Sequence, residues 1–421
     1  MSMTNLVFLC HQRVIHPFIN SEIHVARSRF SSIHYVTLKL DDDNLNVGKG
    51  ENVRIEQVTT LLWYLALLRL PLMLLRTESL ANIVAAIRAK KFGWRFVRHH
   101  VAHLMYAEVL KMRADQVIKE CLVKSKKVYV LACWFSVEAY AAAQLKMKYP
   151  QILVGSLAHA FEVDHKRNDF IGQSFNRQKH SQLDRITFIS RLVYENYYMR
   201  VMFGLRLADK NVSIRYLGCR KLYAALNHPS SDNIFRVWSC SSVVSVKRLA
   251  LMAEALGAWT EGRIEWTHIG GGPLFDDLQT KSATLTSANS LVSVKLLGTK
   301  TNDQVHRYFV ENQCDIFINL SSSEGLPVSL MECMAYGVPA VVTDVGGNSE
   351  IVNAETGFLL PQDFAPQGVC DLLASYRRLH ISDKQRYRDA AYKQWVENFD
   401  ADQTGAEFYD KLLGDLQSQV I

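Results

Sequence analysis

Residues 315–347 read DIFINLSSSEGLPVSLMECMAYGVPAVVTDVGG, and this stretch decides the fold class. Residues 316–320 and 338–343 are short apolar runs rich in branched side chains, which predicts two buried strands. Pro327 stands where a helix between them should begin, and Gly337 where it should end. This order of strand, helix and strand predicts a crossover unit of an open parallel sheet, and therefore an α/β protein.

The loop before this helix is where a ligand is expected. Parallel sheets bind ligands beyond the carboxyl ends of their strands, and residues 321–326 lead from such an end into a helix amino terminus, which favours an anion. Glu324 lies in this loop and Glu332 on the helix among apolar residues. A buried carboxylate needs hydrogen-bond donors, and the vicinal hydroxyls of a ribose or hexose would supply them. A solvated place for Glu332 on an amphipathic helix remains open.

The two glutamates and their surroundings resemble a known signature. The spacing Glu324-x7-Glu332, with the flanking strand, the Gly337-Val-Pro turn and Asp344-Val-Gly-Gly, is similar to that of retaining family 4 glycosyltransferases. The resemblance implies the GT-B fold, in which two Rossmann-like parallel-sheet domains face each other across a cleft and the C-terminal helix crosses back.

Chain length agrees with two domains. A chain of 421 residues is long for a single hydrophobic core, and the polar stretch 227–232 is typical of a linker. The expected division is an acceptor-side domain over 1–226, a linker over 227–233, a nucleotide-sugar-binding domain over 234–400 and a returning helix over 401–421.

Charge is divided unevenly between the halves. Residues 1–225 hold 33 Lys and Arg against 17 Asp and Glu, whereas the remainder holds 15 against 24. The first half is therefore expected to face an anionic partner. A membrane surface is favoured over nucleic acid, because 61–75 is strongly apolar but too short to span a bilayer, and 88–100 is basic with interleaved aromatics. An ordinary core helix followed by a solvated basic face is the alternative.

The cysteines and the chain start indicate the compartment. Eight cysteines are scattered without a Cys-x-x-Cys pair, which favours reduced thiols in a cytoplasm over disulfides or zinc. Residues 6–10 are of strand length and are followed by polar residues, so no cleavable signal is expected. Asp41-Asp-Asp43 could suggest a metal-binding acidic motif, but its loop context favours a solvated turn, and no Asp-x-Asp motif of the GT-A type is expected. We expect a cytoplasmic protein, peripheral on the inner face of the membrane, without metal or cofactor.

Two motifs follow strands of the first half. The loop after the strand at 5–10 lacks paired glycines, and 17–23 resembles a Pro-Phe-x-x-x-Glu-Ile variant of some polysaccharide-assembly members of the family. Leu157-Ala-His159-Ala-Phe-Glu162 resembles the family's His-Gly-x-Asp element. The resemblance implies that His159 hydrogen-bonds a hexose hydroxyl near the reacting carbon. Taken alone, a histidine at a strand end is more often structural.

The second half carries the donor motifs. Residues 239–248 take the place of the family's Gly-Arg-Leu-x-x-x-Lys, with Lys247 on the lysine, Ser242 where the arginine belongs, and Arg248 as a candidate replacement cation. The glycine turn at 270–272 is a weak phosphate signal. With His159 and Glu324 as catalytic residues, the donor-binding residues implied are Ser242, Lys247, Arg248, Gly271, Gly272, Gly325, Leu326, Val328, Ser329 and Glu332.

The implied reaction moves a hexose, with retention, from a nucleoside diphosphate sugar to a glycan or lipid-linked acceptor in surface polysaccharide synthesis. Uridine diphosphate is the family-level expectation. One alternative is a GT-B sugar-nucleotide epimerase or hydrolase. Another is a non-catalytic glycan-binding or scaffold subunit, which the departures at Ser242 and Glu162 motivate.

Overall fold

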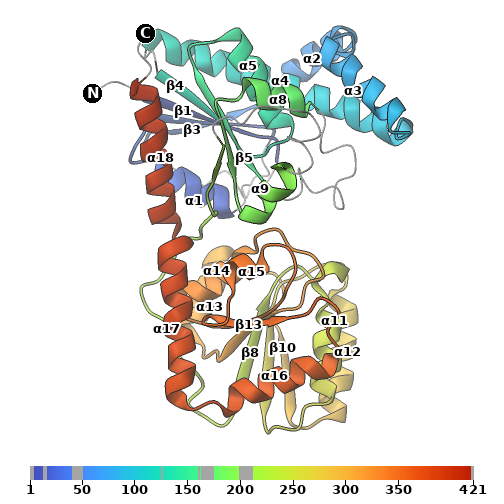
Figure 1. Cartoon of the computed structure of the whole chain (residues 1–421), viewed down its shortest axis with the longest axis vertical. Helices are drawn as coiled ribbons and strands as arrows, with labels where there is room; N and C mark the ends of the chain where they lie inside the picture. The colour runs from blue at the N-terminus through green and yellow to red at the C-terminus, as the bar shows by residue number, and fades with distance from the viewer. Residues whose placement is uncertain are drawn as a thin grey trace. The chain divides into compact units, whose positions relative to one another are not determined.

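The computed structural model describes residues 4–12, 17–39, 51–124, 127–159, 162, 175–198 and 212–418. The chain divides into two compact units, which we call unit 1 (Met1–Leu217 with Thr404–Ile421) and unit 2 (Gly218–Gln403). Each unit contains one parallel sheet with helices packed against it (Figure 1). The expected two parallel-sheet domains are confirmed. The expected turn at Asp41–Asp43 lies outside the described residues.

Unit 1 is built on a seven-stranded sheet with the order β3-β2-β1-β4-β5-β6-β7. The central strand β1 is buried along its whole length, as a strand covered on both faces should be. Leu6 pairs with Ile33 on one side and with Tyr129 on the other. The strands are β1 (Thr4–Cys10), β2 (Ser32–Thr37), β3 (Val53–Gln57), β4 (Lys127–Ala132), β5 (Leu153–Ala158), β6 (Arg185–Phe188) and β7 (Val212–Ile214).

The helices of unit 1 connect these strands. The apolar stretch at 61–75 forms a helix, α2, which packs on the long helix α4, and α4 packs in turn on α5. The helices are α1 (Pro17–Ala26), α2 (Thr60–Leu74), α3 (Thr77–Arg88), α4 (Trp94–Lys124), α5 (Val137–Lys148), α8 (Asn176–Gln182) and α9 (Arg191–Tyr197).

Unit 2 is built on a six-stranded sheet with the order β10-β9-β8-β11-β12-β13. Its core includes Trp238, Trp259 and Trp266, all fully buried. The strands are β8 (Phe235–Cys240), β9 (Ile264–Ile269), β10 (Val292–Leu296), β11 (Ile316–Asn319), β12 (Ala340–Thr343) and β13 (Gly357–Leu360). The helices are α11 (Leu249–Gly257), α12 (Phe275–Ala288), α13 (Asn302–Glu311), α14 (Val328–Ala335), α15 (Asn348–Ile351), α16 (Pro366–Arg378) and α17 (Ile381–Asn398), with a 3₁₀ turn η4 (Ser245–Lys247) before α11.

The deciding stretch folds as expected. β11, α14 and β12 follow one another, and β11 pairs parallel with β12 through Phe317 and Ala340. Pro327 is the residue before the first turn of α14. Gly337 follows the helix with a φ of 72°, a left-handed conformation that glycine adopts without a steric penalty.

The last helix, α18 (Ala401–Ser418), returns the chain to unit 1. A buried cluster anchors it: Arg215 donates to both carboxylate oxygens of Glu22, at 2.9 and 2.7 Å, and the Tyr409 hydroxyl donates to the same carboxylate at 2.7 Å. The expected return of the C-terminal helix is confirmed. Glu22, the glutamate of the 17–23 motif, therefore joins α1 to α18 within unit 1.

Arg215→Met is expected to destabilise unit 1 by about 3–5 kcal/mol, because Glu22 would remain buried without its cation. Urea denaturation monitored by circular dichroism measures this loss. The double variant Arg215→Met/Glu22→Leu removes both charges and should recover part of the stability. If the single variant has the same urea midpoint of unfolding as the wild-type protein, the Arg215–Glu22 pair does not hold α18 in place.

The expected linker at 227–233 is packed into unit 2. Asn227 is buried and donates to the carbonyls of Phe309 (2.6 Å) and Asn312 (2.8 Å). Ser230 donates to Asp315 through both its amide and its hydroxyl. Polar composition indicated a loose connection, but these side chains make hydrogen bonds within unit 2 instead. The units divide between Leu217 and Gly218.

Candidate active site

The loop between β11 and α14 holds Glu324 in a polar cage. This residue is 8% exposed, and one carboxylate oxygen, Oε1, accepts hydrogen bonds from three groups. Lys247 Nζ lies at 2.5 Å, Ser321 Oγ at 2.6 Å and Asn319 Nδ2 at 3.1 Å. Charge-assisted bonds of this kind are short and strong, so the carboxylate is fixed in place before any ligand binds.

Lys247 and Glu324 come from different crossovers of the same sheet. Lys247 ends the 3₁₀ turn after β8, and Glu324 follows β11, the strand that pairs with β8. The carboxyl ends of neighbouring parallel strands meet at one edge of the sheet, so the topology brings these two charges together. The sequence placed both residues in the site, but only the structure shows that they are paired.

Glu332 is buried on α14. It is 6% exposed, and its Oε1 accepts from Asn302 Nδ2 at 2.6 Å. His306 Nε2 lies 3.5 Å from the same oxygen, and Nδ1 of that ring lies 2.7 Å from the Tyr336 hydroxyl. The alternative of a solvated position for Glu332 is therefore wrong. Asn302 and His306, both on α13, position the carboxylate, and sequence spacing gave no sign of either.

The paired glycines after β12 support the glutamate loop. A Cβ at Gly346 would lie 2.0 Å from the carbonyl oxygen of Glu324, and one at Gly347 would lie 2.3 Å from that of Gly325. The amide of Gly347 also donates to the Gly325 carbonyl at 2.8 Å. Only glycine allows this approach, so the Asp344-Val-Gly-Gly motif fixes the backbone that carries Glu324.

The second glycine turn also serves backbone packing. A Cβ at Gly271 would lie 2.5 Å from Thr299 Oγ1, and one at Gly272 would lie 2.6 Å from the Val243 carbonyl oxygen. Val243 donates its amide to the Gly271 carbonyl at 2.9 Å. Gly271 and Gly272 thereby hold the β8–α11 loop, which carries Ser242 and Lys247, against the end of β9.

Arg248 supports the site from within the protein. Its guanidinium donates to three carbonyls, those of Leu320 (2.5 Å), Ser321 (3.0 Å) and Gln362 (2.9 Å). It would have to leave these acceptors to meet a diphosphate, so we assign it to the support of the glutamate loop. Ser242 is exposed and carries no charge. Among the predicted donor-binding residues, Lys247 is then the cation that stands beside Glu324.

Helix α14 offers backbone donors beside the glutamate loop. The first-turn amides of a helix, here those of Val328 and Ser329, have no acceptor within the helix. Gly325 and Leu326 are half-buried and lead into this turn. A helix amino terminus with unsatisfied amides attracts anionic oxygens, and phosphate is the usual one.

Unit 1 has its own cluster at the carboxyl ends of β1, β4 and β5. His159 directly follows β5, and its Nε2 lies 3.0 Å from the carbonyl oxygen of Cys133. Its ring stacks on Trp134, with centroids 5.8 Å apart, and lies 5.3 Å from the ring of Phe18. The bond to the carbonyl requires a proton on Nε2 and sets the orientation of the imidazole.

Buried charges lie behind this aromatic group. Burial raises the pKa of the Glu162 carboxyl to about 8, although the amide of His159, which donates to it at 2.7 Å, opposes the rise. Burial also lowers the pKa of Lys179 to about 7, and Glu162 and Glu138 oppose that shift. Lys179 Nζ donates to the carbonyl of Phe135 at 3.0 Å. The cluster therefore titrates near neutral pH, where perturbed groups are typical of functional sites.

His11 and Glu138 form the ion pair of this cluster. His11 Nδ1 contacts Glu138 Oε1, and the His11 amide donates to the same oxygen at 2.9 Å. Burial alone would lower the pKa of His11, but the Glu138 carboxylate outweighs it and raises the pKa to about 9. No sequence motif indicated His11, Trp134, Glu138 or Lys179. For His11 and Trp134, the one available signal was their position just beyond two buried strands.

His11 should make stability depend on pH. Its folded pKa of about 9 exceeds its ordinary value of 6.5, so its contribution is complete below pH 6.5 and is lost as the pH rises through 9. Relative to His11→Gln, the wild-type protein should lose about 3 kcal/mol of unfolding free energy between these pH values. Urea titrations from pH 6 to pH 10 measure the difference. Parallel pH profiles for the two proteins would contradict the assignment.

Comparisons with known proteins agree with this architecture. Residues 235–375 match the family described as glycosyl transferases group 1. The amylovoran biosynthesis glycosyltransferase AmsK of Erwinia amylovora is 32% identical over 151 residues, which are 34% of this chain and 35% of that protein. The putative teichuronic acid biosynthesis glycosyltransferase TuaC of Bacillus subtilis is 30% identical over 133 residues, or 32% and 30% of the two chains. The aligned regions thus span about a third of these relatives.

Solved structures match over nearly the whole chain. Anabaena Alr3699/HepE, in complex with UDP and glucose, superposes with a TM-score of 0.65 at 13% identity over 98% of this chain and 100% of the other. The lipopolysaccharide outer core galactosyltransferase WaaB superposes with a TM-score of 0.63 at 16% identity over the same shares. These identities show the fold. Residues 235–375 are thus similar to the glycosyl transferases group 1 family, in a chain that has the GT-B fold.

Proposed function

We propose that the protein is a retaining glycosyltransferase of family 4, which moves a hexose from a nucleoside diphosphate sugar, a UDP-sugar, to a glycan or lipid-linked acceptor in surface polysaccharide synthesis. The observation that carries the proposal is the pair of buried carboxylates, Glu324 and Glu332, held by donors at the carboxyl end of one sheet. The names of the relatives, which refer to amylovoran and teichuronic acid, support the pathway class.

In the proposed donor complex, one glutamate binds the nucleoside part of the sugar nucleotide and the other binds the hexose. Glu332 accepts hydrogen bonds from the two ribose hydroxyls, while Asn302 holds its carboxylate in place. Glu324 accepts from hexose hydroxyls. A sugar hydroxyl can replace the contact that Lys247 makes with Glu324, which releases the ammonium toward the diphosphate. Their ion pair therefore keeps both groups ready for the donor.

The chemical step breaks the bond between the anomeric carbon and the diphosphate oxygen. Negative charge grows on the leaving diphosphate, and Lys247 with the first-turn amides of α14 stabilises it. The acceptor hydroxyl forms the new bond on the same face of the sugar, and its proton passes to the departing phosphate oxygen. No side chain is required as a covalent nucleophile. His159, whose Nε2 proton is donated to the Cys133 carbonyl, accepts a hydrogen bond from a hexose hydroxyl near the reacting carbon.

A panel of nucleotide sugars tests the proposal. The melting temperature should rise with one nucleoside diphosphate sugar well above the others, because a ligand that binds only the folded state stabilises it. With that donor, release of free diphosphate should require an added acceptor. Turnover without acceptor would indicate a hydrolase or an epimerase, and the absence of any shift would favour a scaffold subunit.

Transfer should persist in the presence of EDTA. In the proposal, Lys247 and the α14 amides supply the positive charge that a divalent ion supplies in other transferases. A product assay with and without chelator, on protein dialysed against it, measures this. A large loss of transfer that Mg²⁺ or Mn²⁺ restores would contradict the assigned role of Lys247.

We also propose that the protein works in the cytoplasm, at the inner face of the membrane. All eight cysteines lie within the described residues and none of them forms a disulfide, which suits a reducing compartment. Nucleotide sugars and a lipid-linked acceptor would meet at this face.

A further inference from the structure

Helix α2 has an exposed apolar face. Its buried side chains, Leu62, Ala66 and Met73, lie within unit 1, where α2 packs on α4. Other leucines of α2 lie three or four residues apart, so they share one face of the helix. This face, continued by the residue that follows the helix, is called the leucine stripe: Leu61 (65% exposed), Tyr64 (64%), Leu68 (76%), Leu72 (68%) and Leu75 (68%). Contiguous exposed apolar side chains of this kind mark an interaction surface.

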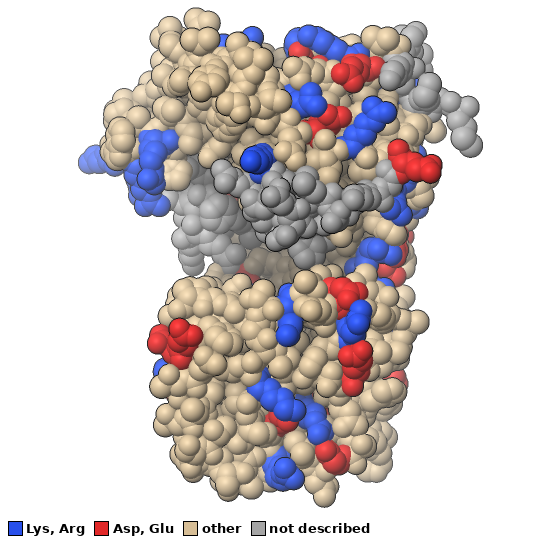
Figure 2. Space-filling view, turned by 180° about the vertical axis from the view of Figure 1, so that it is seen from behind, with Lys and Arg blue, Asp and Glu red and all other residues tan. Residues whose placement is uncertain are grey.

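Positive charge predominates in the segment that follows the leucine stripe. No Asp or Glu occurs between residues 79 and 107, whereas Arg88, Lys90, Lys91, Arg95 and Arg98 do. In the space-filling view, Lys and Arg gather without acidic neighbours at the edge of unit 1 that α2 and α3 form (Figure 2). Exposed Trp94 and Phe92 lie in the same segment. Apolar side chains bordered by cations complement a bilayer with anionic headgroups.

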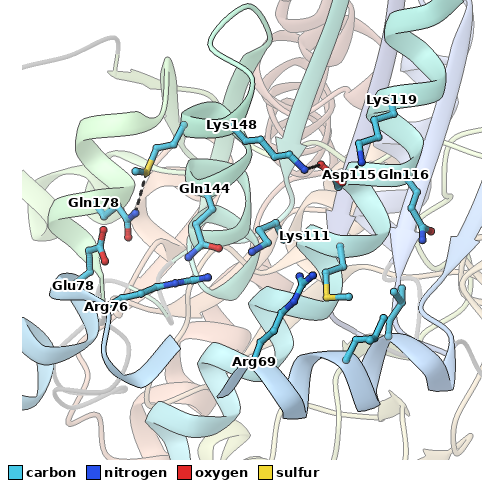
Figure 3. A pocket seen from close by; sticks show the side chains of 14 residues that line it. Arg69, Arg76, Glu78, Lys111, Asp115, Gln116, Lys119, Gln144, Lys148 and Gln178 are labelled. Atoms are coloured by element: carbon cyan, nitrogen blue, oxygen red, sulfur yellow. Dashed lines mark hydrogen bonds and ion pairs between the residues drawn. The ribbon is translucent and has the colours of Figure 1, made fainter. Parts of the chain in front are cut away.

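A basic pocket of about 620 Å³ is lined in part by α2, the helix that carries the stripe. Figure 3 shows cations from three helical elements around it: Arg69 from α2, Arg76 before α3, and Lys111 from α4. Lys119 and Lys148 also line it, with only Glu78 and Asp115 as carboxylates. Leu62 and Leu65 of α2 line the pocket together with Arg69, so the pocket and the stripe share this helix.

The cations exceed the negative charge available to them. Arg69, Arg76 and Lys111 all contact one buried carboxylate, that of Glu108, at 3.1, 3.6 and 2.5 Å. Burial lowers the pKa of Lys111, Glu108 opposes this shift, and Arg76 and Arg69 add to it. Three cations on one carboxylate leave a local excess of positive charge, which an anion in the pocket would balance.

We propose that this pocket binds the phosphate of an anionic membrane lipid while the leucine stripe of α2 lies among the acyl chains. The exposed leucines of the stripe match the acyl chains of a lipid, and the cations of the pocket match its anionic headgroup. The Lys148 side of the pocket and the His11–Glu138 pair lie at opposite ends of α5: Lys148 ends the helix and Glu138 lies in its first turn, about 15 Å away along the axis. Lipid binding therefore leaves that cluster free and stands independently of the proposed transfer reaction.

Vesicle flotation of the full chain tests the proposal, without any sugar nucleotide. Wild-type protein should float with phosphatidylcholine vesicles that contain phosphatidylglycerol and should remain below pure phosphatidylcholine vesicles. Arg69→Gln/Lys148→Gln should weaken the binding about thirtyfold, because each cation near an anionic surface contributes roughly a factor of five. Both side chains are 51% exposed, so the fold should survive, and circular dichroism checks this.

Two further variants complete the test. Arg307→Gln/Arg386→Gln removes the same charge from exposed positions of unit 2, where the side chains are 56% and 81% exposed, and should float like wild type. Leu68→Ser/Leu72→Ser should also lose flotation, since a charged pocket alone holds only a loose, salt-sensitive contact.

Several results would overturn the proposal. One is equal flotation with neutral vesicles, and another is a pocket variant that floats like its control. A third concerns a wild-type protein that does not float with vesicles. If inorganic phosphate raises its melting temperature, and the pocket variant shows no such rise, the proposal is wrong. That result would assign the pocket to a soluble phosphate compound.

Discussion

Glu324→Gln is expected to lower kcat/KM for sugar transfer by about 10³-fold while the protein remains folded. Glutamine keeps the shape of the side chain and the acceptor for Asn319 and Ser321, but it loses the charge that holds Lys247. Removing one preorganised electrostatic contact from a transition state typically costs 10²–10³-fold, and this change affects two such contacts, one with the hexose and one with the lysine. Initial rates with donor and acceptor measure the loss.

The matched control for this variant is Glu261→Gln. Glu261 is also a carboxylate of unit 2 paired with a cation, Arg378, but it lies on the surface, away from the sheet edge that carries Glu324. It should transfer at the wild-type rate. Transfer by Glu324→Gln within about twofold of wild type would remove Glu324 from the site.

His159→Ala is expected to lower transfer by about 10²–10³-fold. The imidazole is held by the Cys133 carbonyl and by stacking on Trp134, so it is oriented before substrate binds. Loss of an oriented hydrogen-bond partner at the hexose should reduce kcat more than the affinity for the donor. Donor affinity by calorimetry and turnover by product assay separate these two effects.

His228→Ala serves as the control for the histidine variant, because His228 is exposed on unit 2. It should leave transfer unchanged. If His159→Ala also transfers normally, then its place after β5 is structural, as an isolated histidine at a strand end usually is.

The sequence predicted the architecture because local and long-range signals agree in unit 2. Pro327 and Gly337 mark the ends of a helix between two runs of branched residues, and both do so in the structure. β2 and β3 of unit 1 were not predicted. β3 is only half-buried, so its residues do not form the continuous apolar run that identifies a buried parallel strand.

The site was predicted in part. Glu324 and Lys247 form an ion pair beyond the ends of β11 and β8, and Glu332 is buried against α13. Motif spacing can indicate such residues. Arg248 illustrates the limit: its sequence position suggested a phosphate ligand, but a φ of 50° and three carbonyl acceptors tie it to the loop below. Whether a cation faces a ligand or a carbonyl depends on tertiary contacts, which a single sequence does not contain.

The residues that position Glu332 also depend on tertiary contacts, and a single sequence does not reveal them. Asn302 and His306 lie a whole crossover away from Glu332 in sequence, and neither belongs to a recognisable motif. They reach Glu332 because α13 packs beside α14 in the folded protein.

The central claim is that Glu332 holds the nucleoside and Glu324 the transferred sugar. Isothermal titration calorimetry of UDP and UDP-glucose against the wild-type, Glu332→Gln and Glu324→Gln proteins tests it most directly. Glu332→Gln should weaken both ligands about equally, by roughly tenfold or more for the lost charge-assisted bonds, whereas Glu324→Gln should weaken UDP-glucose and leave UDP bound as in wild type. If the wild-type protein binds UDP-glucose and both variants bind it with the same affinity, the roles given to Glu332 and Glu324 are wrong.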